Sequence, residues 1–194
     1  GELLPEDVQK KHGFQKKLND IPPSVAHISL YIGLDTTSES LGLTKNNRWI
    51  YPGEDHDASI ENYLANPDEA PLPVAYLSFP SSKDPSFQTR YPGRGTVEVV
   101  GLAPFEWFAE WDGTRWKKRG DDYEALKAKL SKRLLEPLLK EYPQIENHIA
   151  HMELSTPLST KTFCSFEQGE IYGLEHTPKR FRQDWLRPQT PIKG

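Results

Sequence analysis

Hydrophobic and polar side chains alternate most regularly between residues 26 and 34, in the stretch AHISLYIGL. Successive residues of a β-strand point to opposite faces of a sheet, so this period of two predicts a strand with one apolar face and one polar face. The apolar face carries Ala26, Ile28, Leu30, Ile32 and Leu34, and the opposite face carries His27, Ser29 and Tyr31. This segment is the clearest strand in the sequence.

Four shorter stretches are also typical of strands: RWIYP (48–52), PVAYLSFP (73–80), TVEVVGL (96–102) and HIAHMELST (148–156). A short helix is predicted between the second and third strands, over ASIENYLAN (58–66), where Ile60, Tyr63 and Leu64 share a face. Strands and helices do not alternate strictly. The order therefore predicts an α+β fold, a mixed but largely antiparallel sheet with helices packed on one face.

The longest helix is predicted to begin at Asp121 or Asp122. Because Pro137 lies inside this pattern, we expect a kink or a break at residues 133–136. The apolar residues at helical spacing are Tyr123, Leu126, Leu130, Leu134, Leu135, Leu138 and Leu139.

Composition limits the classes of protein that this chain can represent. Its 194 residues, 36% of them hydrophobic, suffice for one sizeable core, and no linker divides residues 1–194, so we expect a single domain. The net charge of −4 comes from interspersed acidic and basic residues, which argues against nucleic acid as the main partner. The single cysteine, Cys164, excludes an internal disulfide. With no secretory signal and no membrane-spanning apolar run, a cytoplasmic location is expected.

Two groups of residues contain side chains that can bind metal ions. His148 and His151 are three residues apart, but on a strand they point to opposite faces, so a structural role is favoured and no metal is expected. The acidic stretch EDHD (54–57) could bind a hard cation in principle. A helix cap made by Asp55 or Asp57 explains it more simply.

Nucleophile and nucleotide motifs are missing from the sequence. It contains no G-x-S-x-G, no G-x-G-x-x-G and no G-x-x-x-x-G-K-[ST]. Cys164 has no local signature of a nucleophile, so we expect it to be a buried apolar residue. The chain therefore has no recognisable phosphate-binding loop, and no side chain is identified as catalytic.

The densest aromatic cluster is PFEWFAEWDGTRW (104–116). Wound as a helix, it places Phe105, Trp107, Phe108 and Trp111 on one side. Packing against the sheet is the favoured interpretation. The alternative is a lining for an apolar ligand, or a shallow membrane contact helped by the adjacent basic RWKKR (115–119).

The stretch GEIYGLE (169–175) encloses an aromatic residue between two glycines. Glycines at such positions permit a positive φ or allow a close approach of the backbone.

Several stretches together resemble one family. They look like the C-terminal half of the retinol saturase and carotenoid isomerase branch of flavin oxidoreductases, which is related to phytoene desaturases. The stretches are LSFPSSKDPSF (77–87), PFEWFAEW (104–111), ELSTPLST (153–160), GEIYGLEHT (169–177) and RPQTPIKG (187–194).

This resemblance implies an FAD enzyme that acts on carbon–carbon double bonds of a polyene or another isoprenoid. In the family, FAD is held by an N-terminal dinucleotide-binding segment and by a C-terminal motif after a sequence like that at residues 190–194. This sequence has neither, so it resembles a substrate-side domain that bears no FAD of its own, and residues 187–194 would lead into the strand before that motif.

The resemblance also implies site residues. Thr156, Pro157, Gly169, Tyr172 and Gly173 match positions near the flavin or its substrate, and they are the predicted cofactor contacts. The predicted substrate contacts are Phe105, Trp107, Phe108, Trp111 and Leu174.

Two functional hypotheses follow. The first is the substrate-binding region of an FAD-dependent polyene oxidoreductase, inactive alone, whose partners are the polyene, the rest of a parent chain and a peripheral membrane surface. The second is a stand-alone module that binds a lipid or isoprenoid through the aromatic cluster at 104–116.

Overall fold

The alternating segment at residues 26–34 forms β1, which lies inside a five-stranded sheet of order β2-β3-β4-β1-β5. The computed structural model describes residues 4–189 and residue 192. Every strand pair within them is antiparallel, which confirms the predicted α+β class. The strands are β1 (His27–Leu34), β2 (Arg48–Ile50), β3 (Ala75–Ser78), β4 (Gly95–Leu102) and β5 (Ile149–Ser155).

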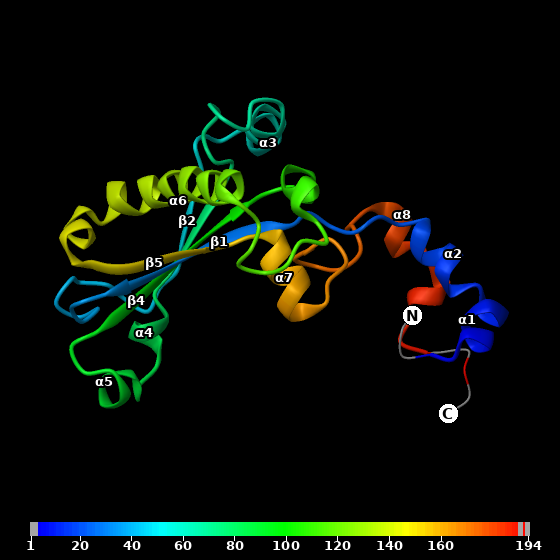
Figure 1. Ribbon diagram of the computed structural model, residues 1–194, viewed down its shortest axis with the longest axis horizontal. Helices are drawn as coiled ribbons and strands as arrows, with labels where there is room; N and C mark the ends of the chain where they lie inside the picture. The colour runs from blue at the N-terminus through cyan, green and yellow to red at the C-terminus, as the bar shows by residue number, and fades with distance from the viewer. Residues whose placement is uncertain (1–3, 190–191, 193–194) are drawn as a thin grey trace.

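Helix α6 covers one face of the sheet, helices α4, α5 and α7 lie on its other side, and further helices extend the molecule at one end. The longest, α6, lies along the sheet, whereas α1, α2 and α8 gather at the end away from it (Figure 1). The α-helices are α1 (Glu6–His12), α2 (Phe14–Asn19), α3 (His56–Ala65), α4 (Pro80–Lys83), α5 (Phe87–Arg90), α6 (Asp121–Glu141), α7 (Pro157–Cys164) and α8 (Pro178–Phe181). The 3₁₀ helices of the described residues are η1 (Phe105–Trp111), η2 (Pro143–His148) and η3 (Asp184–Leu186).

The core fills the space between α6 and the sheet. Strand β1 contributes the predicted apolar face, from Ile28 to Leu34, and α6 contributes Leu130, Leu134 and Leu138. At Gly101 of β4, an added Cβ would lie 2.9 Å from Leu134 Cδ2. The absence of a side chain at this position therefore lets the helix lie close to the sheet.

Helix α6 runs unbroken through Pro137, so the break considered from the sequence is absent. Leu134 and Leu138, on either side of the proline, are fully buried. The helix also keeps its final hydrogen bond, in which the Tyr142 amide donates to the Leu138 carbonyl at 2.8 Å. Packing on both sides of Pro137 therefore outweighs the lost backbone hydrogen bond.

Of the two predicted caps, Asp55 caps helix α3: its carboxylate accepts a hydrogen bond from the Ala58 amide at 3.0 Å, and the helix begins at His56, two residues before the predicted start. Its apolar face is narrower than expected. Tyr63 is buried and donates through its hydroxyl to the Leu102 carbonyl at 2.9 Å, but Ile60 and Leu64 are exposed.

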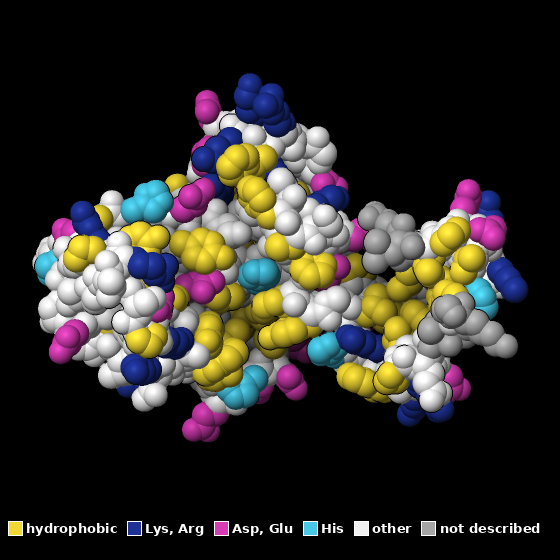
Figure 2. All heavy atoms as spheres, turned by 90° about the horizontal axis from the view of Figure 1, so that it is seen from below, with side chains coloured by type: hydrophobic (Ala, Val, Ile, Leu, Met, Phe, Trp, Pro, Cys, Tyr) yellow, Lys and Arg dark blue, Asp and Glu magenta, His cyan; other side chains and the backbone are white. Residues whose placement is uncertain are grey.

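The sheet face opposite α6 has a different composition. The strand register sets Trp49, Tyr76, Val100, Ser29 and Ser155 side by side in one row across it. The next row is Ser78, Glu98, Tyr31 and Glu153. We call this surface the open face. Seen from below in Figure 2, the molecule shows apolar side chains mixed with basic residues, acidic residues and histidines.

Within the described part of the chain, none of the helices has the length and apolar character needed to cross a bilayer. The sequence-based expectation for residues 187–194 concerns a segment in which only 187–189 and 192 are described. It lies largely outside the described residues.

Candidate functional site

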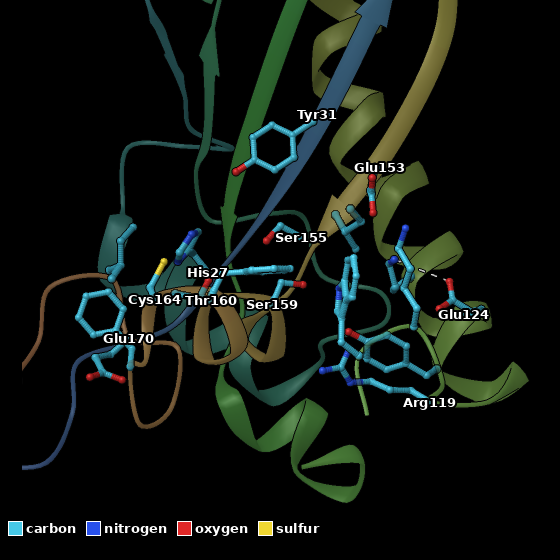
Figure 3. A pocket seen from close by; sticks show the side chains of 18 residues that line it. His27, Tyr31, Arg119, Glu124, Glu153, Ser155, Ser159, Thr160, Cys164 and Glu170 are labelled. Atoms are coloured by element: carbon cyan, nitrogen blue, oxygen red, sulfur yellow. Dashed lines mark ion pairs between the residues drawn. The ribbon is translucent and has the colours of Figure 1, made fainter. Parts of the chain in front are cut away.

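A cavity of about 780 Å³ lies where the open face meets α7 and the start of α6 (Figure 3). This volume falls within the range of about 300–1,000 Å³ that is usual for small-molecule sites. The lining residues are His27, Tyr31, Trp116, Lys117, Arg119, Tyr123, Glu124, Lys127, Glu153, Leu154, Ser155, Ser159, Thr160, Phe163, Cys164, Phe166, Glu170 and Ile171.

The wall formed by α7 is positioned by a capping box. Thr156, directly after β5, caps the helix through the Ser159 backbone amide, while the Ser159 hydroxyl accepts from the Thr156 amide. Pro157 occupies the first helical position, where a missing N–H costs nothing. The chain thus turns sharply from β5 into a helix that carries Thr160 and Phe163 to the cavity.

Glu170 and Ile171 form what we call the floor of the cavity, and a close backbone contact at Gly169 holds it in place. The φ of Gly169 is +64°, and an added Cβ would lie 2.3 Å from the Pro157 carbonyl oxygen. The following residues pair with the chain just before β1, through bridges between Ala26 and Glu170 and between Pro23 and Leu174. Gly169 therefore has both properties predicted for the glycines of this stretch, a positive φ and a close approach.

Aromatic rings form the apolar wall. The Trp116 and Phe163 rings meet edge to face, with centroids 5.2 Å apart. Lys117 lies with its ammonium group 4.6 Å from the Trp116 centroid. This wall offers flat apolar surface to a ligand, with Phe166 and Ile171 also lining the cavity.

A cationic group occupies the α6 side of the cavity. The Arg119 guanidinium lies 5.2 Å from the centre of the Tyr123 ring, and Lys127 Nζ lies 5.9 Å from the same ring. Lys127 also forms a long ion pair with Glu124, at 3.7 Å. Figure 3 shows Arg119 and Glu124 on one side of the cavity and Glu170 on the other, so the side of Arg119 carries charges of both signs.

Tyr123, whose ring lies beside Arg119 and Lys127, connects these two side chains to the start of α7. Its hydroxyl forms a 2.7 Å hydrogen bond with Thr156 Oγ1, which joins α6 to the start of α7. Burial raises the pKa of Tyr123, and its hydrogen bond to Thr156 opposes that rise. The phenol therefore stays protonated at neutral pH.

Two titratable groups of β1 also face the cavity. Burial lowers the pKa of His27, which favours the neutral imidazole. Burial also raises the pKa of Tyr31, and the negative charge of Glu98 adds to that rise. Among the described residues, two buried side-chain nitrogens have no hydrogen-bond partner, His27 Nδ1 and Arg119 Nε, and both belong to residues of this cavity.

The predicted cofactor contacts lie next to the cavity. Thr156, Pro157 and Gly169 are buried and pack against one another, and packing alone explains their conformations. Tyr172 is 61% exposed, and Gly173 has a φ of +70° with open space where a Cβ would stand. A role for these five residues at the flavin remains a prediction.

The predicted substrate contacts lie mainly in the core. Phe108 is fully buried, while the edges of Trp107 and Trp111 meet the rings of Tyr63 and Tyr123 at 5.3 and 5.4 Å. Phe105 also packs against the core. This arrangement agrees with the favoured packing interpretation of the aromatic cluster.

Leu174, the fifth predicted substrate contact, is half-buried in its bridge with Pro23. None of the five residues lines the cavity, although Trp111 supports Tyr123 from behind. Direct contact between these residues and a substrate remains a prediction.

Cys164 corrects an expectation. It is exposed and lines the cavity, because it ends α7, whereas the sequence led us to expect a buried apolar residue.

His148 and His151 do not form a pair of ligands: His148 Nδ1 is 2.9 Å from Asp35 Oδ1, and His151 is exposed on the open face. Within residues 4–189 and 192, no group of three or more His, Cys, Asp or Glu residues is arranged to hold a metal ion.

The residues that sequence reasoning missed are Arg119, Tyr123 and the pair formed by His27 and Tyr31. The alternation of the first strand did place His27 and Tyr31 on one face, which was the available signal. Tyr123 was interpreted as part of an apolar helix stripe, and Arg119 as part of a basic run. Only the tertiary structure brings them together around one cavity.

Comparison with known proteins gives a consistent family relationship. No model of a known protein family matches the chain. The chain is 37% identical to all-trans-retinol 13,14-reductase from Danio rerio over 198 residues, which cover 99% of this chain and 33% of the relative. Proteins of the same name from Rattus norvegicus and Homo sapiens are 35% and 32% identical, over 98% of the chain and 32% of each relative.

The chain spans about a third of the length of the curated relatives that it matches. The matches confirm the resemblance to retinol saturase that the sequence motifs indicated. Over nearly its whole length, the chain is therefore homologous to part of the all-trans-retinol 13,14-reductases.

Proposed function

We propose that this chain is the substrate-binding part of an FAD-dependent oxidoreductase that acts on carbon–carbon double bonds of a polyene or isoprenoid. The observation that carries the proposal is the cavity, walled by aromatic rings and bordered by the open face, in a chain homologous to retinol reductases. A conjugated chain is long, flat and apolar, and rings such as Trp116 and Phe163 provide matching surface.

The open face supports the same proposal. An antiparallel sheet commonly has one face on the core and the other on solvent, where polar residues dominate. Here Trp49 and Tyr31 stand on the open face with exposures of 59% and 48%. Such rings suit a surface that meets another part of a parent protein, and we propose that this part is its FAD-binding domain.

The residues of this chain fit only the ring end of FAD. Of the five predicted cofactor contacts, Tyr172 presents an exposed flat ring, whereas the space beside Gly169 is already filled by the Pro157 carbonyl. The sequence has no phosphate-binding glycine motif for the pyrophosphate. When bound, FAD would supply the two-electron chemistry, and the residues of this chain would bind and orient the polyene.

A retinoid titration of the 194-residue chain tests the binding part of the proposal. All-trans-retinol should quench tryptophan fluorescence at micromolar concentration. Trp116→Phe should remove most of the change, because Trp116 lines the cavity. Trp49→Phe is the matched control, since Trp49 lies on the open face but outside the cavity. Unchanged fluorescence in the unsubstituted chain would reject the proposal.

Absorbance tests the cofactor part. The parent protein, purified from cells, should show a flavin spectrum, while the 194-residue chain alone should be colourless and should not reduce retinol. A parent protein that neither contains nor takes up flavin would exclude the oxidoreductase. Retinol binding without flavin would instead indicate an isoprenoid-binding module.

A further inference from the structure

The segment between η1 and α6 borders the cavity although none of its side chains is buried. Residues 112–118, which we call the strap, form neither helix nor strand, and every one of them is exposed. Two of them, Trp116 and Lys117, line the cavity. A segment of this kind has low local stability, because its opening exposes little additional apolar surface. The strap therefore depends on the contacts that it makes with its neighbours at the surface.

Two residues near the end of α7 hold the strap. Lys161 Nζ pairs with Asp112 Oδ2 at 2.9 Å, and the two side chains are 37% and 35% exposed. The Phe163 ring meets the Trp116 ring edge to face, with centroids 5.2 Å apart. An ion pair this exposed contributes little to stability and is weakened by salt. The strap is thus fastened to α7 by contacts that break easily.

The backbone of the strap allows it to move as a unit. Near its start, Gly113 has a φ of +74° and open space where a Cβ would stand, so it can change conformation without a steric cost. Near its end, Lys117 has a φ of +59°, which is unfavourable for a residue with a side chain and which an open strap would relieve. Just beyond, Arg119 packs on the Tyr123 ring with its Nε buried and so stays with α6.

We propose that the strap is a gate, which swings away from α7, separates Trp116 from Phe163 and admits the ligand to the cavity. The ion pair between Asp112 and Lys161 is its latch. Both rings line the cavity and are exposed, so their contact lies at its rim. This inference rests on the proposed function, in which the FAD-binding domain covers the open face and leaves the rim between the strap and α7 for entry.

The first experiment detects the opening without a ligand. The tryptophans are replaced by 5-fluorotryptophan, and ¹⁹F relaxation dispersion measures exchange on the microsecond-to-millisecond timescale of loop motions. The Trp116 signal, identified with Trp116→Phe, should show exchange, whereas that of Trp107, which packs on Tyr63, should show none. Asp112→Asn removes the charge of the latch but keeps an acceptor for the Gly113 amide. It should raise the open population about two- to fivefold.

Two further variants serve as controls. Asp68→Asn breaks an ion pair of the same kind, with Lys129, outside the cavity, and it should leave the exchange of Trp116 unchanged. Asp112→Lys combined with Lys161→Asp restores opposite charges and should restore the original exchange. Sodium chloride at about 1 M should act on the unsubstituted chain as Asp112→Asn does, and should add little to that variant. A Trp116 signal without exchange in every variant would overturn the gate.

Stopped-flow fluorescence then tests the entry of retinol. Asp112→Asn should raise the rates of association and dissociation by the same factor, about two- to fivefold, and leave the dissociation constant unchanged, because a gate controls the path to the cavity and not the bound contacts. If retinol binds with equal rates to the variant and to the unsubstituted chain, the gate is overturned and the proposed function stands. Failure of retinol to bind either chain would overturn both proposals.

Discussion

The two faces of the sheet are built from the same strands but differ in what they contain. Under α6, the residues of β1 are Ile28, Leu30, Ile32 and Leu34, each at most 2% exposed. On the open face, the residues between them are Ser29, Tyr31 and Gly33; Ser29 is buried, whereas Tyr31 is 48% exposed. The first face is a core of the ordinary kind. The second keeps rings and titratable groups at a surface, where they are available to a ligand or to another domain.

The difference shows that alternate residues of β1 have different roles. Because successive side chains point to opposite faces, β1 can stabilise the fold with every second residue and line a cavity with those between. Stability and binding should therefore be separable by single substitutions at adjacent positions.

The largest effect should come from the neighbours Ile32 and Tyr31. Ile32→Ala removes buried methyl groups and should lower the free energy of unfolding by about 2–5 kcal/mol. Tyr31→Ala should change it by about 0.5 kcal/mol or less, while weakening retinol binding. Urea unfolding measures the first quantity and fluorescence titration the second. Similar losses of stability in the two variants would show that both faces are buried.

A pair of glycines near the cavity floor should give the next effect. Gly169→Ala combines a left-handed conformation, which costs about 1–2 kcal/mol, with a clash against the Pro157 carbonyl, which costs about 1–3 kcal/mol more. Gly173→Ala is the matched control, because it has the same sign of φ but open space around it. It should show only the conformational cost. Equal unfolding midpoints for the two variants would contradict the packing of Gly169 on Pro157.

The smallest effect should be a pH dependence from His27. Its pKa is lowered in the folded state, so near pH 6.5 the unfolded chain binds a proton that the folded chain does not. The free energy of unfolding should therefore fall as the pH drops from about 7.5 to about 5.5. In His27→Gln this part of the slope should vanish. If the free energy of unfolding depended on pH in the same way in the variant and in the unsubstituted chain, the burial of a neutral imidazole would be contradicted.

Local patterns were sufficient to predict the strands. The period of two at residues 26–34 identified both faces of β1, and Asp55 was correctly considered as a helix cap. Pro137 shows the limit of local rules, because the buried leucines on either side of it hold α6 together. That balance depends on what the helix packs against, which a single sequence does not contain.

The cavity could not be predicted in the same way. It joins residues from His27 to Ile171, and the contacts that shape it have no local signature. The glycines of 169–175 indicated a positive φ, but not that Gly169 rests on Pro157. Similarly, Arg119 belongs to the basic run 115–119, which the sequence links to a membrane contact and not to a cavity. Its contacts with Tyr123 and Thr162, and the burial of its Nε, arise only in the tertiary structure.

The ladder between residues 22–26 and 170–175 also has an energetic consequence for binding. The amides of Ile171 and Glu175 donate to the carbonyls of Val25 and Pro22, at 3.0 and 2.8 Å, and the Ser24 amide donates to Gly173 at 2.6 Å. These hydrogen bonds and the packing of Gly169 against Pro157 fix the floor of the cavity before a ligand binds. A preorganised wall loses little conformational entropy on binding, so more of the contact energy remains as affinity.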